Sequence, residues 1–270
     1  MLIDAHCHVW RIGQNGHEWP TPDLAAIYRD FDLRNLEQDS KLYDLSGVIL
    51  VQSQPSERDT GWLLELAAAD PLALGVVGWT DLAAPDAPDR IATLARDPWL
   101  KGLRPMLQDL ASDWILDPKL APAIAAIIAA DLPFDALVKP RHLPAMLELL
   151  RRWPDLRIVI DHGAKPEIAA GRLDPWREEM AALAAEPGVH CKLSGLLTEA
   201  GDRPTAQAVE PYARHLIEVF GPDRLMWGSD WPVLNLAGDY PSWRAMCEAW
   251  APSEQHAALF GETARRFYRL

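Results

Sequence analysis

The sequence predicts an α/β fold, a single TIM (β/α)8 barrel, from the order and spacing of its short apolar runs. Runs with β-strand composition alternate with helical segments, and this alternation is typical of parallel strands joined by crossover helices. Eight such units can be read in the 270 residues, a length that barrels reach as one domain. From the second run onward, successive runs begin 23 to 35 residues apart, which leaves room for one strand and one helix in each unit. We therefore expect residues 1–270 to form one domain.

The expected strands are apolar runs bounded by turn-type residues. In chain order they cover residues 2–8, 47–52, 74–79, 101–106, 134–139, 157–162, 189–194 and 224–230. The segments between them, such as LPAMLELLRRWP, repeat apolar residues every three or four positions and end at Pro or Gly, which predicts amphipathic helices. The first connection is unusually long, from about residue 10 to residue 46. A connection of this length that contains aromatic residues is typical of a binding loop, so we expect it to cover the active site.

Composition narrows the classes of partner. The chain has 39 acidic and 26 basic residues, a net charge of −13, and no basic block. This balance argues against nucleic acid and membrane surfaces and leaves a small molecule as the expected partner. The three cysteines lack metal-site or secreted-scaffold spacing, and the chain shows no signal-peptide pattern and no run of membrane-spanning length. We expect a cytoplasmic protein that is a monomer or a small homo-oligomer.

The first run, LIDAHCH, places two histidines one residue apart. Because side chains alternate along a strand, Asp4, His6 and His8 should share the inward face, while the odd-numbered residues from 3 to 9 face the helices. Two imidazoles on an inward face must be hydrogen-bonded or bound to a metal to offset their burial. The pair alone leaves both explanations open.

Polar side chains also occur at the ends of other expected strands, where barrel enzymes assemble their active sites. They are Gln52, Arg104, His162, Lys192 and Asp230. In the sixth run, His162 is expected on the face of Ile158 and Ile160. Each polar residue alone has a structural explanation, as hydrogen-bonded scaffolding, an ion-pair partner or a helix cap. Their joint occurrence at one edge of the barrel is what predicts a catalytic cavity.

A set of segments spread over the whole chain carries a family pattern. They are DAHCHVW, VILVQSQPSERDTGWLLELA, GVVGWTDL, LKGLRPMLQD, VIDHGAKP, CKLSGLLTEA, FGPDRLMWGSDWPV and FGETARRFYRL. In this order they resemble the amidohydrolase superfamily, in particular its group of metal-dependent hydrolases that contains lactonases for L-fucono- and L-rhamnono-lactones. The resemblance implies a distorted TIM barrel that opens a sugar-acid lactone with water.

The resemblance also implies a metal site, with His6, His8, His162 and Asp230 as ligands. Two-metal members of the superfamily add a bridging lysine or glutamate on the fourth strand and a histidine on the fifth. The corresponding runs here, GLRPM and FDALVK, offer neither a bridging carboxylate nor a histidine at the strand end. We therefore expect at most one divalent ion, with zinc as the first choice, or no required metal.

Lactone hydrolysis needs a positioned water, a base, and positive charge for the developing oxyanion. Asp230 is the expected base, with a pKa raised by desolvation. The three histidines would orient the water or hold the metal, and Lys192 and Arg104 would supply charge. The expected substrate-binding residues are Arg104, Gln52, Trp10, Trp19 and Trp231, with Asn235 as a further candidate.

Two other functions stay open at this point. One is hydrolysis of a carboxylated lactone such as a muconolactone, or decarboxylation of an aromatic acid, which would need several arginines at the mouth; Arg104 and Arg141 are the candidates. The other is a non-catalytic barrel that binds a sugar acid. The complete set of histidines, Lys192 and Asp230 speaks against it.

Overall fold

The computed structural model describes residues 1–202 and 204–270, and within them eight parallel strands form one sheet, ordered β1 to β8 along the chain. The strands are β1 (Leu2–Cys7), β2 (Leu45–Val51), β3 (Ala73–Gly78), β4 (Leu100–Leu103), β5 (Phe134–Ala136), β6 (Ile158–Ile160), β7 (Val189–Leu193) and β8 (Leu225–Trp227). Each overlaps one of the expected runs. The predicted TIM barrel is confirmed.

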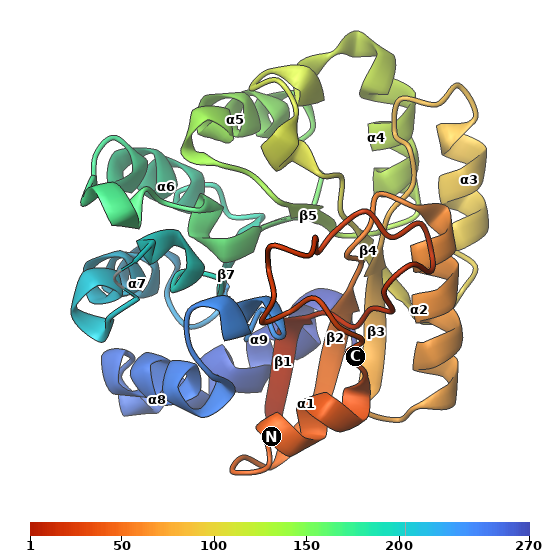
Figure 1. The fold of residues 1–270 in the computed structure, drawn as a ribbon. Helices are drawn as coiled ribbons and strands as arrows, with labels where there is room; N and C mark the ends of the chain where they lie inside the picture. The colour runs from red at the N-terminus through yellow and green to blue at the C-terminus, as the bar shows by residue number, and fades with distance from the viewer. Residues whose placement is uncertain (203) are drawn as a thin grey trace.

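Helices lie around the strands (Figure 1). They are α1 (Leu33–Asp39), α2 (Glu57–Ala69), α3 (Ala87–Leu94), α4 (Ala121–Ala129), α5 (Leu143–Arg152), α6 (Trp176–Ala184), α7 (Ala206–Phe220), α8 (Tyr240–Trp250) and α9 (Thr263–Tyr268). Ser56, Thr205 and Asp239 begin α2, α7 and α8 by accepting hydrogen bonds from N–H groups of the first turn. Of the helices that the structure describes, none combines the length and apolar character needed to cross a bilayer.

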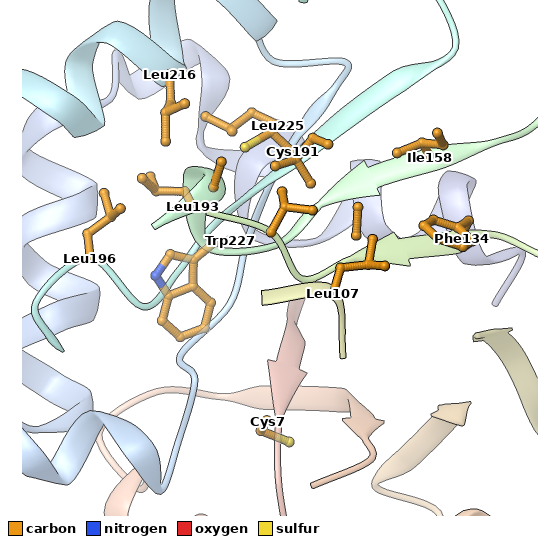
Figure 2. Close-up of a cluster of buried hydrophobic side chains, with 14 of the residues drawn as sticks. Cys7, Leu107, Phe134, Ile158, Cys191, Leu193, Leu196, Leu216, Leu225 and Trp227 are labelled. Carbon is orange, nitrogen blue, oxygen red and sulfur yellow. The ribbon is translucent and has the colours of Figure 1, made fainter. Parts of the chain in front are cut away.

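Apolar side chains form two layers, one on each side of the strands. The outer layer packs between the strands and the helices, and Figure 2 shows part of it, with Phe134, Ile158, Cys191 and Leu225 contributed by four consecutive strands. The inner layer fills the barrel and includes side chains from α9. It consists of Ile3, Ala5, Ile49, Val51, Val77, Val159, Met226, Ala264, Phe267 and Tyr268.

Strand β1 departs from simple alternation. Ile3 and Ala5 belong to the inner layer, so Asp4 turns to the other side, and the expectation that it shares a face with His6 is wrong. The carboxylate of Asp4 accepts a hydrogen bond of 3.1 Å from the backbone N–H of His6. The pairing of β1 with β2 shifts register between Asp4 and Cys7. Irregularities of this kind re-aim side chains next to active sites, and here one brings His6 to the interior.

The segment after β8 closes the barrel against β1. The N–H of Asp230 donates to the carbonyl of His6 at 2.8 Å, and the N–H of His8 donates to the carbonyl of Trp231 at 2.7 Å. Gly228 makes this approach possible, because a Cβ there would lie 2.7 Å from the Cβ of His6. These contacts place the side chain of Asp230 beside His6 in β1 and His8 just after it.

Candidate active site

A cavity of about 700 Å³ opens at the carboxyl ends of the strands. Its lining includes residues that follow six of the strands: His8, Gln54, Trp79, Arg104, His162 and Asp230. This is the edge at which barrel enzymes place their active sites. The position expected from the sequence therefore holds a cavity.

Three imidazoles and one carboxylate meet at the floor of this cavity. Nε2 of His8 lies 3.2 Å from Oδ1 of Asp230 and 3.2 Å from Nε2 of His6. The same carboxylate oxygen lies 3.7 Å from Nε2 of His6 and 3.8 Å from Nε2 of His162. None of the four residues is more than 4% exposed. The structure thus brings together the four residues that the family resemblance implied as ligands.

Two of these imidazoles are oriented through their other ring nitrogen. Nδ1 of His8 lies 2.7 Å from the carbonyl oxygen of Val51, and Nδ1 of His162 lies 2.8 Å from Oγ of Ser194. The carbonyl can only accept, so the proton of neutral His8 is on Nδ1. Its Nε2 then offers a lone pair to the cluster.

His162 reaches the cluster through a left-handed backbone turn. Its φ is 53°, and that of Asp230 is 58°; such values are rare outside glycine, and this kind of strain gathers at functional sites. Ile158 and Ile160 lie in the outer layer, so the expectation that they share the face of His162 is wrong. The turn sends His162 inward instead. Gly195 leaves room for it, because a Cβ there would lie 2.5 Å from Nδ1 of His162.

Lys192 lies beneath the cavity floor and is not among the residues that line it, because its ammonium is enclosed by side chains. Nζ lies 2.5 Å from Oδ2 of Asp135, 3.0 Å from Oδ1 of Asp161 and 3.1 Å from Nδ1 of His6. The hydroxyl of Tyr268 donates to Asp135 at 2.7 Å. Burial acts to lower the pKa of Lys192, but the two carboxylates outweigh it and raise that pKa. The ammonium therefore stays charged and is held in place.

Asp135 and Asp161 were not singled out from the sequence. Both are fully buried. The available signal was a carboxylate inside an apolar run, since a buried acid almost always has a partner. Alternation from the inward-facing Val159 would also have pointed Asp161 into the barrel.

Arg104 reaches the cavity, and Gln52 holds it there. One guanidinium nitrogen of Arg104 donates to the carbonyl of Gln52, and Nη1 lies 3.4 Å from Nε2 of His6 and 3.7 Å from Oδ2 of Asp161. In return, Nε2 of Gln52 donates to the carbonyl of Arg104 at 3.0 Å. Gln52 and Asn235, both expected to bind substrate, are not among the lining residues. Gln52 is instead a support for Arg104.

Lys165 is a second cation in the lining, and the sequence analysis did not single it out. Its Nζ lies 3.0 Å from Oε1 of Glu199. Arg141, the other arginine considered from the sequence, points elsewhere and donates to the carbonyls of Gln108 and Leu110 at 2.9 and 3.0 Å. Among the residues that the structure describes, Arg104 and Lys165 are therefore the cations that line the cavity.

Of the three tryptophans expected to contact substrate, Trp19 lines the cavity, while Trp10 and Trp231 do not. The indole N–H groups of those two donate to partners inside the 10–46 segment, at 2.9 and 2.8 Å, and both side chains are buried. They support the segment from below. Trp79 and Trp114 contribute aromatic surface to the cavity instead.

The part of the 10–46 segment that precedes α1 is attached to the end of β2 by Gln54; Figure 1 shows it in red between β1 and α1. Oε1 of Gln54 accepts from the N–H groups of Glu18 and Trp19 at 2.8 and 3.3 Å, and Nε2 donates to the carbonyl of Trp19 at 2.5 Å. Asp59 fixes Gln54 in turn, accepting from its N–H at 3.1 Å. Glu18 and Trp19 thereby form part of the cavity wall.

Ionisation at the floor follows from burial and neighbouring charge. Burial acts to raise the pKa of Asp230, but the close contacts with His162 and His8 outweigh it and lower that pKa. The expectation of a raised pKa is therefore wrong. Burial, assisted by the charge of Lys192, holds the pKa of His6 well below its usual value, and burial does the same for His162. At neutral pH the floor carries a carboxylate and neutral imidazoles at these positions, the forms that bind metals.

The donor atoms fit one divalent ion. Those of His6, His8 and Asp230 all lie within 4.8 Å of one another. Ligand atoms in a tetrahedral zinc site with bonds of about 2.0–2.1 Å stand roughly 3.3 Å apart, and the separations of Asp230 Oδ1 from His8 and His6 are 3.2 and 3.7 Å. The site can therefore hold a metal ion.

A (β/α)8 barrel with histidines and a carboxylate gathered at its carboxyl edge is the arrangement of one class of proteins, the barrel hydrolases. The comparison with known families agrees with this class. The chain belongs to the amidohydrolase family, whose sequence profile matches residues 3–270. The resemblance inferred from the sequence is confirmed.

Two bacterial lactonases are similar to this chain over nearly its full length. The chain is 52% identical to the L-fucono-1,5-lactonase of Burkholderia ambifaria, covering 99% of this chain and 95% of that protein. It is 36% identical to the L-fucono-1,5-lactonase of Burkholderia multivorans, covering 100% and 96%. A crystal structure of an amidohydrolase from Burkholderia multivorans with bound zinc superposes with a TM-score of 0.93 at 35% identity, covering 100% of this chain and 99% of that one. These relatives agree with the lactone hydrolase predicted from the sequence.

Proposed function

We propose that the protein hydrolyses a sugar-acid lactone of the L-fucono-1,5-lactone kind to the open-chain acid. The observation that carries the proposal is the carboxylate of Asp230 at the floor of a substrate-sized cavity, within 3.8 Å of an imidazole nitrogen from each of His6, His8 and His162. The lactonases at 52% and 36% identity support the choice of substrate.

In this proposal Asp230 takes a proton from water while the water oxygen attacks the lactone carbonyl carbon. Its lowered pKa keeps it ionised at neutral pH, so it acts through position more than through basicity. Arg104 and Lys165 supply positive charge to the carbonyl oxygen as it becomes an oxyanion. The ring C–O bond then breaks, and the proton held by Asp230 passes to the departing alkoxide, which leaves the acid and a free hydroxyl group.

We also propose that His6, His8, His162 and Asp230 hold at most one divalent ion, with zinc as the first choice. When bound, such an ion lowers the pKa of water or polarises a carbonyl group. The donor separations and the zinc in the Burkholderia multivorans structure support this assignment.

The charge of the cavity favours a neutral substrate over a carboxylated one. Among the residues described, the lining holds the carboxylates of Glu18, Asp81, Asp109 and Asp230 and the cations Arg104 and Lys165. A muconolactone or an aromatic acid would meet excess negative charge, whereas a polyol lactone offers hydroxyl groups to these carboxylates. We therefore rank the carboxylated substrates second.

The proposal extends to the domain organisation, the cellular compartment and the partners of the protein. Residues 1–270 would act as one domain, with segment 10–46 covering the cavity. The protein would work in the cytoplasm as a monomer or small homo-oligomer, without nucleic acid or membrane partners. Three buried free thiols, Cys7, Cys191 and Cys247, are compatible with a reducing compartment.

A pH-indicator assay over a panel of aldono-1,4- and 1,5-lactones, with and without a chelator, tests reaction, ring size and metal together. The expected result is the highest kcat/KM for L-fucono-1,5-lactone and much slower turnover of carboxylated lactones. Calorimetric binding of lactones at one to one without turnover of any of them would contradict hydrolysis. Unchanged turnover in chelator would show that the ion is dispensable.

A further inference from the structure

Nδ1 of His6 lies between two groups of opposite hydrogen-bonding character. Nζ of Lys192 is 3.1 Å away and Oδ1 of Asp161 is 3.4 Å away. All three side chains are fully buried, so water does not take either place. An ammonium only donates hydrogen bonds, and an ionised carboxylate only accepts them.

A neutral imidazole carries one proton, so His6 can satisfy one of these neighbours at a time. If Nδ1 accepts from Lys192, the proton of His6 sits on Nε2. That proton has an acceptor in Nε2 of His8, 3.2 Å away, because the proton of His8 is committed to the carbonyl of Val51. A continuous chain of donors and acceptors then runs from Lys192 to Val51.

Metal binding requires the opposite tautomer. An ion bound at Nε2 of His6 needs the lone pair there, which moves the proton to Nδ1. The N–H on Nδ1 would then donate to Asp161 and face the ammonium of Lys192 at 3.1 Å. Two hydrogen-bond donors that face each other at this distance repel, so the tautomer of His6 that binds a metal is less stable than the tautomer with its proton on Nε2.

We propose that Lys192 holds His6 in the tautomer with its proton on Nε2 and thereby weakens metal binding at the cavity floor. The inference rests on the metal site in the proposed function. Lys192 would be a positioning residue whose target is His6, not a group that meets the substrate. Asp161 is its counterpart, the acceptor that becomes the partner of His6 when an ion binds.

Lys192 has little freedom to withdraw. Its ammonium contacts Asp135 at 2.5 Å and Asp161 at 3.0 Å, and Tyr268 holds Asp135 from the far side at 2.7 Å. Arg104 works in the opposite sense, since its Nη1 lies 3.4 Å from Nε2 of His6. The contacts of Arg104 and Asp161 both favour a proton on Nδ1, and both, at 3.4 Å, are longer than the 3.1 Å contact from Lys192.

The first test compares Zn²⁺ affinity of metal-free wild type, Lys192→Met and Lys192→Met/Asp135→Asn by chelator competition. Removing Lys192 should tighten binding about tenfold or more, the usual scale for outer partners of ligand histidines. The double variant removes one charge of each sign and serves if Lys192→Met does not fold, as judged by circular dichroism.

Loss of any nearby cation also favours a bound cation, so a matched control is needed. Lys165→Met removes a positive charge from the cavity lining without touching His6. The gain for Lys192→Met should clearly exceed the gain for Lys165→Met. Equal gains, or no gain in a folded Lys192 variant, would overturn the proposal.

The second test reads the tautomer directly and needs no metal. Two-bond nitrogen–proton spectra of histidine-labelled metal-free protein distinguish the two tautomers, and a His6→Gln spectrum identifies the signals of His6. We expect a proton on Nε2 in wild type and on Nδ1 in Lys192→Met. A proton on Nδ1 in metal-free wild type would refute the inference, even if no ion ever binds and the metal assignment fails separately.

Discussion

Nε2 of His8 lies 3.2 Å from Oδ1 of Asp230, although 222 positions separate the two residues in the chain. The backbone bonds of Asp230 and Trp231 to β1 enforce this meeting. The carboxylate therefore has a fixed place beside His8 before any substrate arrives. Preorganisation of this kind is what a base that acts by position requires.

Asp230→Asn should abolish most turnover and leave the fold intact, because the amide has the same shape and no basic oxygen. A loss of about 10²–10⁴-fold in kcat is expected for a missing base. The lactone assay measures kcat, and thermal unfolding checks the fold. Asp155→Asn, at an exposed carboxylate, is the control. Activity within a few-fold of wild type would remove Asp230 from the role of base.

Arg104→Met should lower kcat by about 10²–10³-fold, the usual cost of losing one oxyanion donor. Arg104→Lys should restore little, because an ammonium cannot donate to the Gln52 carbonyl and face the cavity at once. Arg151→Met, at an exposed arginine of α5, is the matched control. Full activity of Arg104→Lys would show that only the charge matters.

Gln54→Met should raise KM on the order of tenfold with a smaller change in kcat. The variant loses the bonds to Glu18 and Trp19, which are worth about 1 kcal/mol net each, while the chemistry at the floor is untouched. Limited proteolysis of segment 10–46 should accelerate in parallel. Gln14→Met changes an exposed glutamine in the same segment and should alter neither. An unchanged KM would show that the attachment does not shape the binding site.

Stability should fall as the pH drops from about 6.5 to about 4, partly because of His190. Burial against Phe267 lowers the pKa of His190 to about 4. In that window the unfolded chain binds the proton and the folded protein does not, so the contribution is complete above pH 6.5 and is lost on acidification. The loss is on the order of 3 kcal/mol. Urea unfolding of wild type and His190→Gln at several pH values checks this; identical pH dependence would contradict it.

The sequence was sufficient for the barrel, because the spacing of apolar runs reflects one strand and one helix per unit. It was also sufficient to bring His6, His8, His162 and Asp230 to one edge. The carboxyl ends of parallel strands meet whatever the local details, so residues at those ends converge. The reaction class, lactone hydrolysis, was predicted from the resemblance to the amidohydrolase superfamily.

The alternation of side chains along a strand could not predict the local backbone geometry at β1 and at His162. The irregularity in β1 exchanges the faces of Asp4 and Ala5, and the left-handed turn at His162 reverses its direction. The residue types at these positions do not predict either the irregularity in β1 or the turn at His162. Lys192 was placed on the correct face but too close to the substrate, because the depth of a side chain depends on its partners, Asp135 and Asp161, which come from other strands.

The contact of Tyr268 with Asp135 has a consequence for biosynthesis. Through Asp135 and Lys192, the last helix supports His6 in the first strand. A chain leaves the ribosome from its amino end, so β1 emerges long before α9. His6 therefore lacks this support until α9 has been translated, so it reaches its final environment later than the rest of its own strand.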